Sequence, residues 1–443
     1  RRSRPDGYLA YRASRELTVY LTRFREIGMG ARRFRNPPFK QRVFNLELSH
    51  RFRRASAMSQ SIYLDYNATT PVDERVLERM MPYFSSQFGN ASSGSHSFGW
   101  AAEEAVTVAR EQVAGVFGVD PATLTFTSGA TEALNAAMKG VARAYRRKGR
   151  HVVTVETEHK AVLDTCDALE RDGVEVTRLP VDDDGRVTAG QVRDALRDDT
   201  ILVAVMWANN ETGVLQPIEA ISAVVREHDT LFLTDATQAV GKVPVSAENA
   251  DLLVASGHKA YGPKGIGVLF ARSRSPRVRW TPLVAGGGQE EGRRGGTLNV
   301  PAIVGMGRAF EIAAEEQESD AARMSTLRDQ LETQILDAID DARINGCGAS
   351  RLPNTTSLTL PGVPAEELLL AMRGVACSTG SACASHSNRP SHVLKAHGLS
   401  DADARSTVRL SLGRSTTKEE IDEAAKTLIA TAQRLAQNPA VRI

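Results

Sequence analysis

Short apolar runs alternate with amphipathic stretches from residue 61 to about residue 305. The run TLTFTSG at 123–129 is typical of a strand that ends in a turn. The stretch after it repeats apolar residues at helical spacing, at Leu134, Ala137, Met138 and Val141. Similar strand–helix pairs continue to GIGVLFAR at 265–272. Because such alternation builds parallel sheets that helices cover on both faces, the pattern predicts an α/β domain with a mostly parallel sheet.

The pattern changes after about residue 305. We predict a long amphipathic helix from about Val304 to Ile339, then the strands TTSLTLPG and TVRLSLG and the helices AEELLLAMRG and KEEIDEAAKTLIATAQRLAQ. This order indicates a second domain of the α+β kind. A chain of 443 residues is too long for one small core, which agrees with two or so domains.

Composition narrows the class of protein. The hydrophobic fraction of 42% and the charged fraction of 24% are typical of a globular protein. No apolar run approaches the roughly eighteen residues that a membrane-spanning helix needs, so no membrane association is expected. The four cysteines include no CxxC pair, which argues against a zinc site and a disulfide framework; they are Cys166, Cys347, Cys377 and Cys383. We therefore expect a reducing compartment and no metal.

The charge is concentrated in residues 1–57, which hold fifteen Arg or Lys and four acidic residues. Three interpretations fit: a transit peptide, a basic arm for nucleic acid, or translated upstream sequence with Met58 as the start. We favour the third, because the organised pattern begins only at SIYLDY (61–66). The segment is then disordered or not native, and the protein is cytoplasmic. A mitochondrial location follows only if the segment is a genuine transit peptide.

Polar residues follow several of the predicted strands. In parallel α/β sheets ligands bind at the carboxyl ends of the strands, so we expect these side chains to share one site. They are Ser128, Gly129, Ala130, Thr131, His159, Asn209, Asn210, Asp235, Gln238, Ser256, His258 and Lys259.

The types of residue in this set suggest a particular chemistry. The free N–H groups of Ala130 and Thr131 could bind phosphate at a helix start, although an ordinary capped turn has the same pattern. Asp235 ends an apolar strand and needs a partner, either a protonated pyridine nitrogen or a protein cation. Lys259, in SGHK, is placed as a pyridoxal phosphate enzyme requires for its Schiff base. His159 could stack on such a ring or be a structural histidine.

Ten motifs, in order, resemble cysteine desulfurases of the NifS/IscS type, within the class-V aminotransferase family. The resemblance covers about residues 61–435 and rests on YLDYNATTPV, FGNASSGSHSFG, FTSGATEALN, TEHKAVLDTC, NNETGVLQPI, DATQAVGKVPV, SGHKAYGPKGIG, GGGQEEGRRGGTLNV, STGSACAS and VRLSLGR. It implies the pyridoxal phosphate fold of type I, that of aspartate aminotransferase. The expected large domain covers 71–314, and the small domain combines 58–70 with 315–443 and carries the catalytic-cysteine loop at about 377–391.

The resemblance also implies how the cofactor is held. Lys259 would form the Schiff base, Asp235 would pair with the ring nitrogen, and Gln238 would contact the ring hydroxyl oxygen. His159 would stack on the ring and assist proton transfer. The phosphate would be bound by a further set of small and polar residues: Ala130, Thr131, Ser256, His258 and, from the neighbouring subunit of a homodimer, Thr297.

For the reaction, the resemblance implies conversion of L-cysteine to L-alanine with transfer of sulfur to Cys383. Asn210, which is also expected beside the cofactor, and Arg409 would hold the substrate carboxylate. The persulfide on Cys383 would pass to an iron–sulfur scaffold protein or another acceptor, such as the machinery of tRNA thiolation. The chain departs from the family at Asn388 and Arg389, where a Leu–Glu pair is expected.

Two other functions compete with this one. A lyase for selenocysteine or cysteine sulfinate, or an aminotransferase-like enzyme, would use the same cofactor and depend less on a thiol. A non-catalytic sulfur carrier or nucleic-acid-binding protein would explain the basic N-terminal segment. The joint presence of Lys259, Asp235 and His159 argues against the second class, and we expect no stable binding of nucleic acid. Cys377 is expected to be structural.

Overall fold

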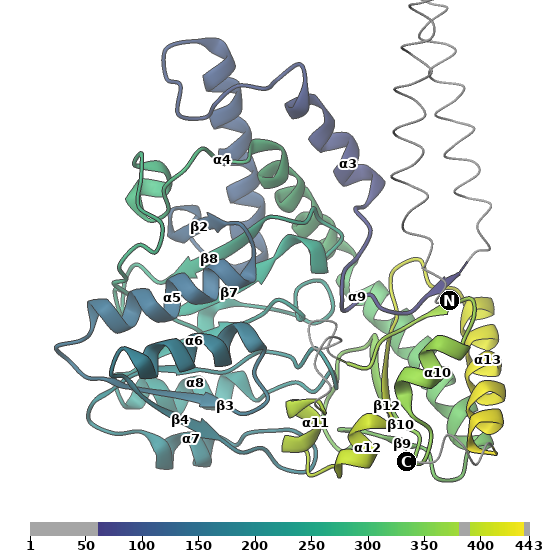
Figure 1. Cartoon of the computed structure of the whole chain (residues 1–443). Helices are drawn as coiled ribbons and strands as arrows, with labels where there is room; N and C mark the ends of the chain where they lie inside the picture. The colour runs from purple at the N-terminus through teal and green to yellow at the C-terminus, as the bar shows by residue number, and fades with distance from the viewer. Residues whose placement is uncertain (1–60, 381–389, 438–443) are drawn as a thin grey trace, which may run out of the picture. The chain divides into compact units, whose positions relative to one another are not determined.

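The computed structural model describes residues 61–380 and 390–437, which belong to one compact unit, Ser61–Ile443 (Figure 1). The basic segment 1–57 and Cys383 lie outside the described residues, as do Asn388 and Arg389. No helix in the described ranges combines the length and the apolar content that crossing a membrane requires.

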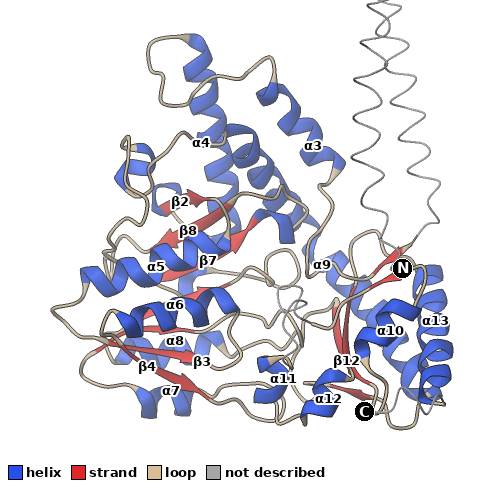
Figure 2. Cartoon of the chain, in the orientation of Figure 1, coloured by secondary structure: helices blue, strands red, loops and turns tan. Residues whose placement is uncertain are grey.

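A seven-stranded sheet forms the centre of the larger part of the fold (Figure 2). Only β8 runs antiparallel to its neighbours, β2 and β7, and the other pairs are parallel. The prediction of a mostly parallel sheet is confirmed. In spatial order the strands are β2 (Leu124–Thr127), β8 (Gly267–Ala271), β7 (Leu252–Ser256), β6 (Leu231–Asp235), β5 (Thr200–Ala204), β3 (His151–Val155) and β4 (Glu175–Leu179).

Helices cover both faces of this sheet, because successive apolar residues of each strand point to opposite sides. Leu252 packs with the helices α5 (Ala130–Ala144) and α6 (Lys160–Arg171), whereas Leu253 packs on the other face. That other face is covered by α4 (Ser97–Phe117), α7 (Ala189–Ala195), α8 (Ile218–Glu227) and the first half of α9 (Val300–Ala338). Each βα connection therefore starts its helix at the carboxyl edge of the sheet.

A separate core lies around a three-stranded antiparallel sheet of β12 (Thr407–Ser411), β10 (Thr355–Thr359) and β9 (Arg343–Ile344). Its apolar side chains come from this sheet, from the second half of α9, and from α10 (Ala365–Ala371) and α13 (Lys418–Ala436). Leu64 belongs to the same core, next to β1 (Ile62–Tyr63), which pairs in parallel with β11 (Val375–Ala376). The boundaries expected from the sequence, 71–314 for a large domain and 58–70 with 315–443 for a small one, stay a prediction.

The remaining elements are short. The α-helices are α3 (Glu74–Met80), α11 (His392–Ala396) and α12 (Asp401–Arg405). The 3-10 helices are η1 (Met81–Phe84), η2 (Pro121–Thr123), η3 (Ala247–Asn249), η4 (Gly257–Lys259) and η5 (Gln289–Gly292).

The helix α9 takes part in both cores. Residues from Val300 to Ala313 are buried against the large sheet, and Leu327, Leu331 and Ile335 are buried in the second core. The predicted helix from about 304 to 339 is therefore present as one continuous element. Near the middle of α9, the Oδ2 atom of Asp320 accepts a hydrogen bond from Nε of Arg414, which follows β12 in the chain, at 2.8 Å.

Candidate active site

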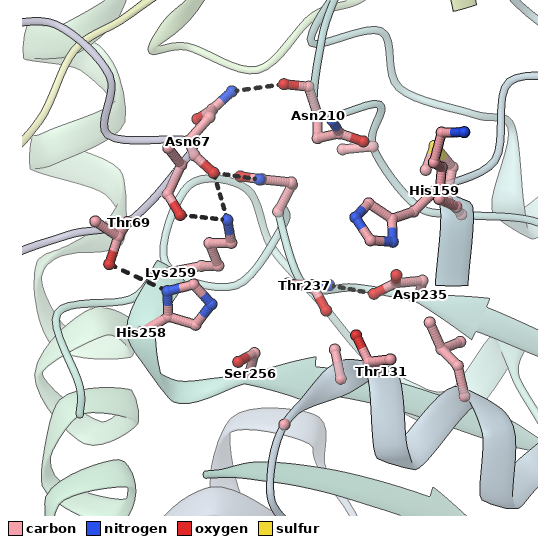
Figure 3. Close-up of a pocket in the computed structure, with 18 of the residues that line it drawn as sticks. Asn67, Thr69, Thr131, His159, Asn210, Asp235, Thr237, Ser256, His258 and Lys259 are labelled. Atoms are coloured by element: carbon pink, nitrogen blue, oxygen red, sulfur yellow. Dashed lines mark hydrogen bonds between the residues drawn. The ribbon is translucent and has the colours of Figure 1, made fainter. Parts of the chain in front are cut away.

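A cavity of about 650 Å³ opens at the carboxyl edge of the large sheet. All the cofactor and substrate residues that the sequence predicts in the described ranges line it, with the exception of Thr297. They are Ala130, Thr131, His159, Asn210, Asp235, Gln238, Ser256, His258, Lys259 and Arg409. Figure 3 shows Thr131 and Ser256 at one end of the cavity, His159 and Asp235 on one side, and His258 and Lys259 on the other.

The end of the cavity near Thr131 has the properties of an anion site. The helix α5 begins here behind Gly129, which has a φ of 154°, and no side chain caps its first turn. The strand β8 approaches this turn closely, since a Cβ at Gly267 would lie 2.5 Å from the carbonyl carbon of Gly129. The open N–H groups at the positive end of the helix dipole favour a phosphate group.

Asp235 ends β6 and lies on the floor of the cavity, with 8% of its surface exposed. Its Oδ1 accepts a hydrogen bond from the main-chain N–H of Thr237 at 2.9 Å. A buried carboxylate with a single N–H donor has capacity for a further donor from the cavity. The position suits a protonated ring nitrogen.

His159 precedes α6 and caps it. Its Nδ1 accepts from the main-chain N–H of Ala161 at 3.1 Å, so the neutral ring carries its proton on Nε2. Burial lowers the pKa of His159, and the charge of Lys259 lowers it further, whereas that of Asp235 raises it. The imidazole is therefore a neutral N–H donor at the cavity wall at neutral pH.

Lys259 extends toward the segment that follows β1. Its Nζ donates to the main-chain oxygens of Asn67 at 2.6 Å and Ala68 at 2.7 Å (Figure 3). The adjacent His258 is hydrogen-bonded through Nδ1 to the hydroxyl of Thr69 at 3.1 Å. Burial, then the charge of Lys259, lowers the pKa of His258 to about 4. The sequence prediction did not include Asn67 and Ala68, because they act through main-chain atoms that side-chain chemistry does not reveal.

Arg409 reaches the cavity from β12, and its guanidinium group is almost fully buried. Nη1 donates to the main-chain oxygens of Asn210 at 2.8 Å and Gly380 at 2.7 Å, and Nη2 pairs with Asp65 at 2.6 Å. Nε is buried with no partner among the described residues.

A second wall of the cavity, absent from the sequence prediction, contains Glu211 and His392. The Ser391 hydroxyl donates to Glu211 at 2.5 Å, and burial raises the pKa of that carboxyl group. His392 Nε2 lies 3.0 Å from the main-chain oxygen of Glu158. These contacts anchor the beginning of α11 beside the cavity.

Of the remaining expected residues, only Thr297 can be placed relative to the cavity, and it does not line it. Thr297 is exposed and precedes α9, and Cys383 lies outside the described residues. Cys377 is partly buried against the second core. Burial raises the pKa of the Cys377 thiol to about 12, so this thiol is protonated at neutral pH. No three His, Cys, Asp or Glu side chains gather as a metal site among residues 61–380 and 390–437.

The residues of the cavity fit pyridoxal phosphate. The uncapped start of α5 matches the phosphate, the buried carboxylate of Asp235 matches a protonated ring nitrogen, and the amine of Lys259 matches the aldehyde. The three groups lie around one cavity and come from separate elements of the same sheet edge.

The comparisons agree with this geometry. The family model for class-V aminotransferases matches residues 62–424, and the chain belongs to this family. Several curated relatives are named as cysteine desulfurases. One from Anaeromyxobacter sp. (strain Fw109-5), named cysteine desulfurase IscS, is 50% identical over 85% of this chain and 94% of its own length. Another of the same name, from Neisseria meningitidis (strain FAM18), is 52% identical over 82% of this chain and 90% of its own length.

Solved structures give the same result. A NifS-like protein superposes with a TM-score of 0.79 at 38% identity, covering 84% of this chain and all of its own. A protein titled SspA in complex with cysteine superposes with a TM-score of 0.71 at 40% identity, over 80% of this chain and 99% of its own. The resemblance to NifS/IscS-type cysteine desulfurases, the type I fold and the dependence on pyridoxal phosphate are confirmed.

Proposed function

We propose that this chain converts L-cysteine to L-alanine and keeps the sulfur as a persulfide on Cys383. The observation that carries the proposal is the meeting of Lys259, Asp235 and the uncapped start of α5 in one cavity. Relatives named as cysteine desulfurases at about half sequence identity support the same reaction.

The chain holds the cofactor by contacts at three points. The N–H groups of Ala130 and Thr131, with the side chains of Ser256 and His258, would hold the phosphate, and Asp235 would pair with the ring nitrogen; all five residues line the cavity. Gln238, which also lines the cavity, would donate from its amide group to the ring oxygen. Pyridoxal phosphate bound through its aldehyde draws electron density from the α-carbon of an amino acid, which weakens the bonds to that carbon. In a subunit pair, Thr297 of the second copy completes the phosphate site.

Lys259 and His159 are assigned different proton transfers. The amine of Lys259 lies on the cavity wall next to Asn67, where it would accept the proton from the α-carbon of the substrate. His159 carries its proton on Nε2 because Nδ1 is occupied by Ala161. We therefore assign His159 first as a donor and Lys259 as the base.

Arg409 and Asn210 orient the substrate. The guanidinium group is held in place by two main-chain oxygens and Asp65, and its Nε is free of partners among the described residues. A carboxylate that binds to this buried cation gains a strong charge-assisted hydrogen bond. This contact selects α-amino acids over thiols that lack a carboxylate.

The sulfur transfer balances without an outside oxidant. The thiolate of Cys383 attacks the substrate sulfur, an S–S bond forms, and the Cβ–S bond breaks. The electron pair of that bond stays with the carbon skeleton, which takes up a proton and leaves as alanine. The substrate carbon is reduced while the two sulfur atoms are oxidised to the persulfide level.

Mass spectrometry of the protein loaded with pyridoxal phosphate tests this function. After addition of L-cysteine we expect alanine in solution and a mass increase of one sulfur atom on the peptide with Cys383. Cys383→Ser abolishes both the persulfide and most alanine formation, whereas the matched Cys377→Ser keeps them. Undiminished turnover of cysteine or selenocysteine by Cys383→Ser would instead identify a lyase of the same family.

The chain also has a surface suited to a homodimer. Seven of the eleven large exposed apolar side chains in the described ranges fall between residues 77 and 108, and Phe84 and Phe88 are 60% and 65% exposed. These seven residues lie in α3, η1, α4 and the loops between these helices. Both α3 and α4 pack on α9. Exposed apolar surface of this kind is typical of an interface, and a second copy of this chain is the proposed partner.

A sulfur acceptor follows from the chemistry. A persulfide is useful only if another molecule removes its outer sulfur, and an iron–sulfur scaffold protein is the proposed acceptor. The three described cysteines, Cys166, Cys347 and Cys377, are all free thiols, which supports a reducing compartment, for which we propose the cytoplasm.

A further inference from the structure

A buried lysine lies behind the active site and has no part in the reaction outlined above. Lys242 follows β6 in the sequence DATQAVGK, and only 6% of its surface is exposed. Its Nζ donates to the side-chain Oε1 of Gln238 at 2.8 Å and to the main-chain oxygen of the same residue at 3.1 Å. No carboxylate forms an ion pair with it in the part of the chain that the structure describes. A buried amine without such a partner is costly, which calls for a function.

The contact with Lys242 determines which way the carboxamide of Gln238 faces. The Nζ atom of Lys242 donates to the amide oxygen, and the main-chain oxygen of Asn67, which can only accept, requires the amide nitrogen at the opposite end of the carboxamide. The nitrogen therefore lies on the other side, where it donates to the main-chain oxygen of Asn67 at 3.0 Å. That oxygen also accepts from Lys259 at 2.6 Å, so the amide nitrogen lies next to the reactive amine.

We propose that Lys242 is a positioning residue that holds the Gln238 carboxamide with its N–H edge toward the ring oxygen of pyridoxal phosphate. This inference rests on the proposed function, since it assigns a cause to one of the cofactor contacts. The second N–H of the same amide group is left for the cofactor, because Gln238 lines the cavity. A rotated amide would present its oxygen to the ring oxygen and repel it.

The amide group of Gln238 keeps this orientation near neutral pH, whether Lys242 is charged or neutral. Burial, followed by the charges of Lys259 and Arg409, lowers the pKa of Lys242 to about 7, and both the charged and the neutral amine can donate to Oε1. Lys242 lines a small second cavity, whose other titratable and charged side chains are Tyr66, Lys259, Tyr261, Asp320 and Arg414.

The test compares wild type with Lys242→Met, which keeps the length of the side chain and removes the donor, using protein loaded with pyridoxal phosphate. The readout is the pH at which the visible band of the bound cofactor changes. We expect that loss of an N–H donor to the ring oxygen raises that pH by about one unit, which corresponds to the free energy of about one hydrogen bond. We also expect kcat to fall about tenfold while KM for cysteine changes less than about twofold. Lys148→Met, at an exposed pair with Asp229, is the matched control.

A double-mutant cycle separates positioning from a plain effect of charge. In the Gln238→Met background, Lys242→Met has no further effect on the band if Lys242 acts through Gln238. A shift of the same size in both backgrounds, or a Lys242→Met band identical with that of wild type, overturns the proposal. If Lys242→Met does not fold, Lys242→Gln takes its place in the same comparison. Because glutamine retains an N–H donor, we then expect a smaller shift of the band than for Lys242→Met, or no shift, in the Gln238→Met background. Wild-type protein that binds the cofactor but forms no alanine would refute the proposed function, while the band comparison would still test Lys242.

Discussion

The Nζ atom of Lys259 lies 2.6 Å from the main-chain oxygen of Asn67. A second main-chain oxygen, that of Ala68, lies 2.7 Å from it. Main-chain oxygens can only accept, so both contacts are donated by the amine. The two contacts hold the reactive amine at a fixed place on the cavity wall.

The first prediction concerns Lys259. Borohydride reduction of protein loaded with pyridoxal phosphate should leave the cofactor covalently attached to the peptide that contains Lys259. Lys259→Ala should lose this adduct and lower alanine formation by at least about a thousandfold, since nucleophile and base are removed together. Lys264, in the loop after η4, also lines the cavity. A stable adduct on Lys264 would contradict the assignment.

The second prediction concerns pH. The pKa of His258 is lowered to about 4 by burial and then by Lys259, against about 6.5 in an unfolded chain. A lowered pKa means that the folded state prefers the neutral ring, so its contribution to stability is complete above pH 6.5 and is lost as pH falls toward 4. The melting temperature of cofactor-free protein should decline across that interval, and His258→Asn should reduce the slope. An unchanged slope in the variant would disprove the link.

The third prediction concerns stability near the phosphate turn. Arg110 and Glu290 form an ion pair at 2.5 Å, with 17% and 0% of their side chains exposed, and Glu290 also accepts from the N–H of Phe126 at 2.8 Å. Removing one partner leaves a buried charge, so Glu290→Ala should cost about 3 kcal/mol in urea unfolding. The exposed pair Arg193–Glu227 provides the control, where Glu227→Ala should cost less than about 1 kcal/mol. Equal losses would show that burial does not decide the effect.

The fourth prediction concerns the proposed homodimer. Phe88 is 65% exposed and its ring lies 5.4 Å from that of Phe98. Phe88→Asp should shift the protein from dimer to monomer in analytical ultracentrifugation, because a charge in an apolar interface is unpaired. We also expect the affinity for pyridoxal phosphate to fall about tenfold, because Thr297 of the second copy is lost. Leu370→Asp, at an 84% exposed site in α10, should change neither property.

Much of the fold could be predicted from the sequence because apolar spacing is local. The strand and helix that flank His159 are placed within a few residues, as are those around Asp235 and Lys259. The helix α4 was not predicted, since its buried face consists largely of alanine, at Ala102, Ala105 and Ala109, which contrasts weakly with its polar neighbours. The five-residue helices α11 and α12 are too short to show a period.

The site was predicted only as far as it depends on side chains that follow strands. Asp235, Ser256 and Lys259 each end or follow a strand, so the topology of a parallel sheet brings them together. Asn67 contributes a main-chain oxygen across a separation of 192 residues, and Lys242 acts on the cavity only through Gln238. Contacts of this kind depend on tertiary packing and leave no pattern along the chain.

The continuous course of α9 through both cores limits how the length of the chain can vary. A residue inserted into an α-helix turns everything after it by about 100° and moves it by about 1.5 Å. In α9, such a change between Ala313 and Leu327 would rotate the buried face that the second core needs away from that core. Exposed turns such as that at Gly173, between α6 and β4, have no such constraint from two cores. We therefore expect that insertions and deletions are tolerated in the turns but unfold the protein when they fall in the middle of this helix.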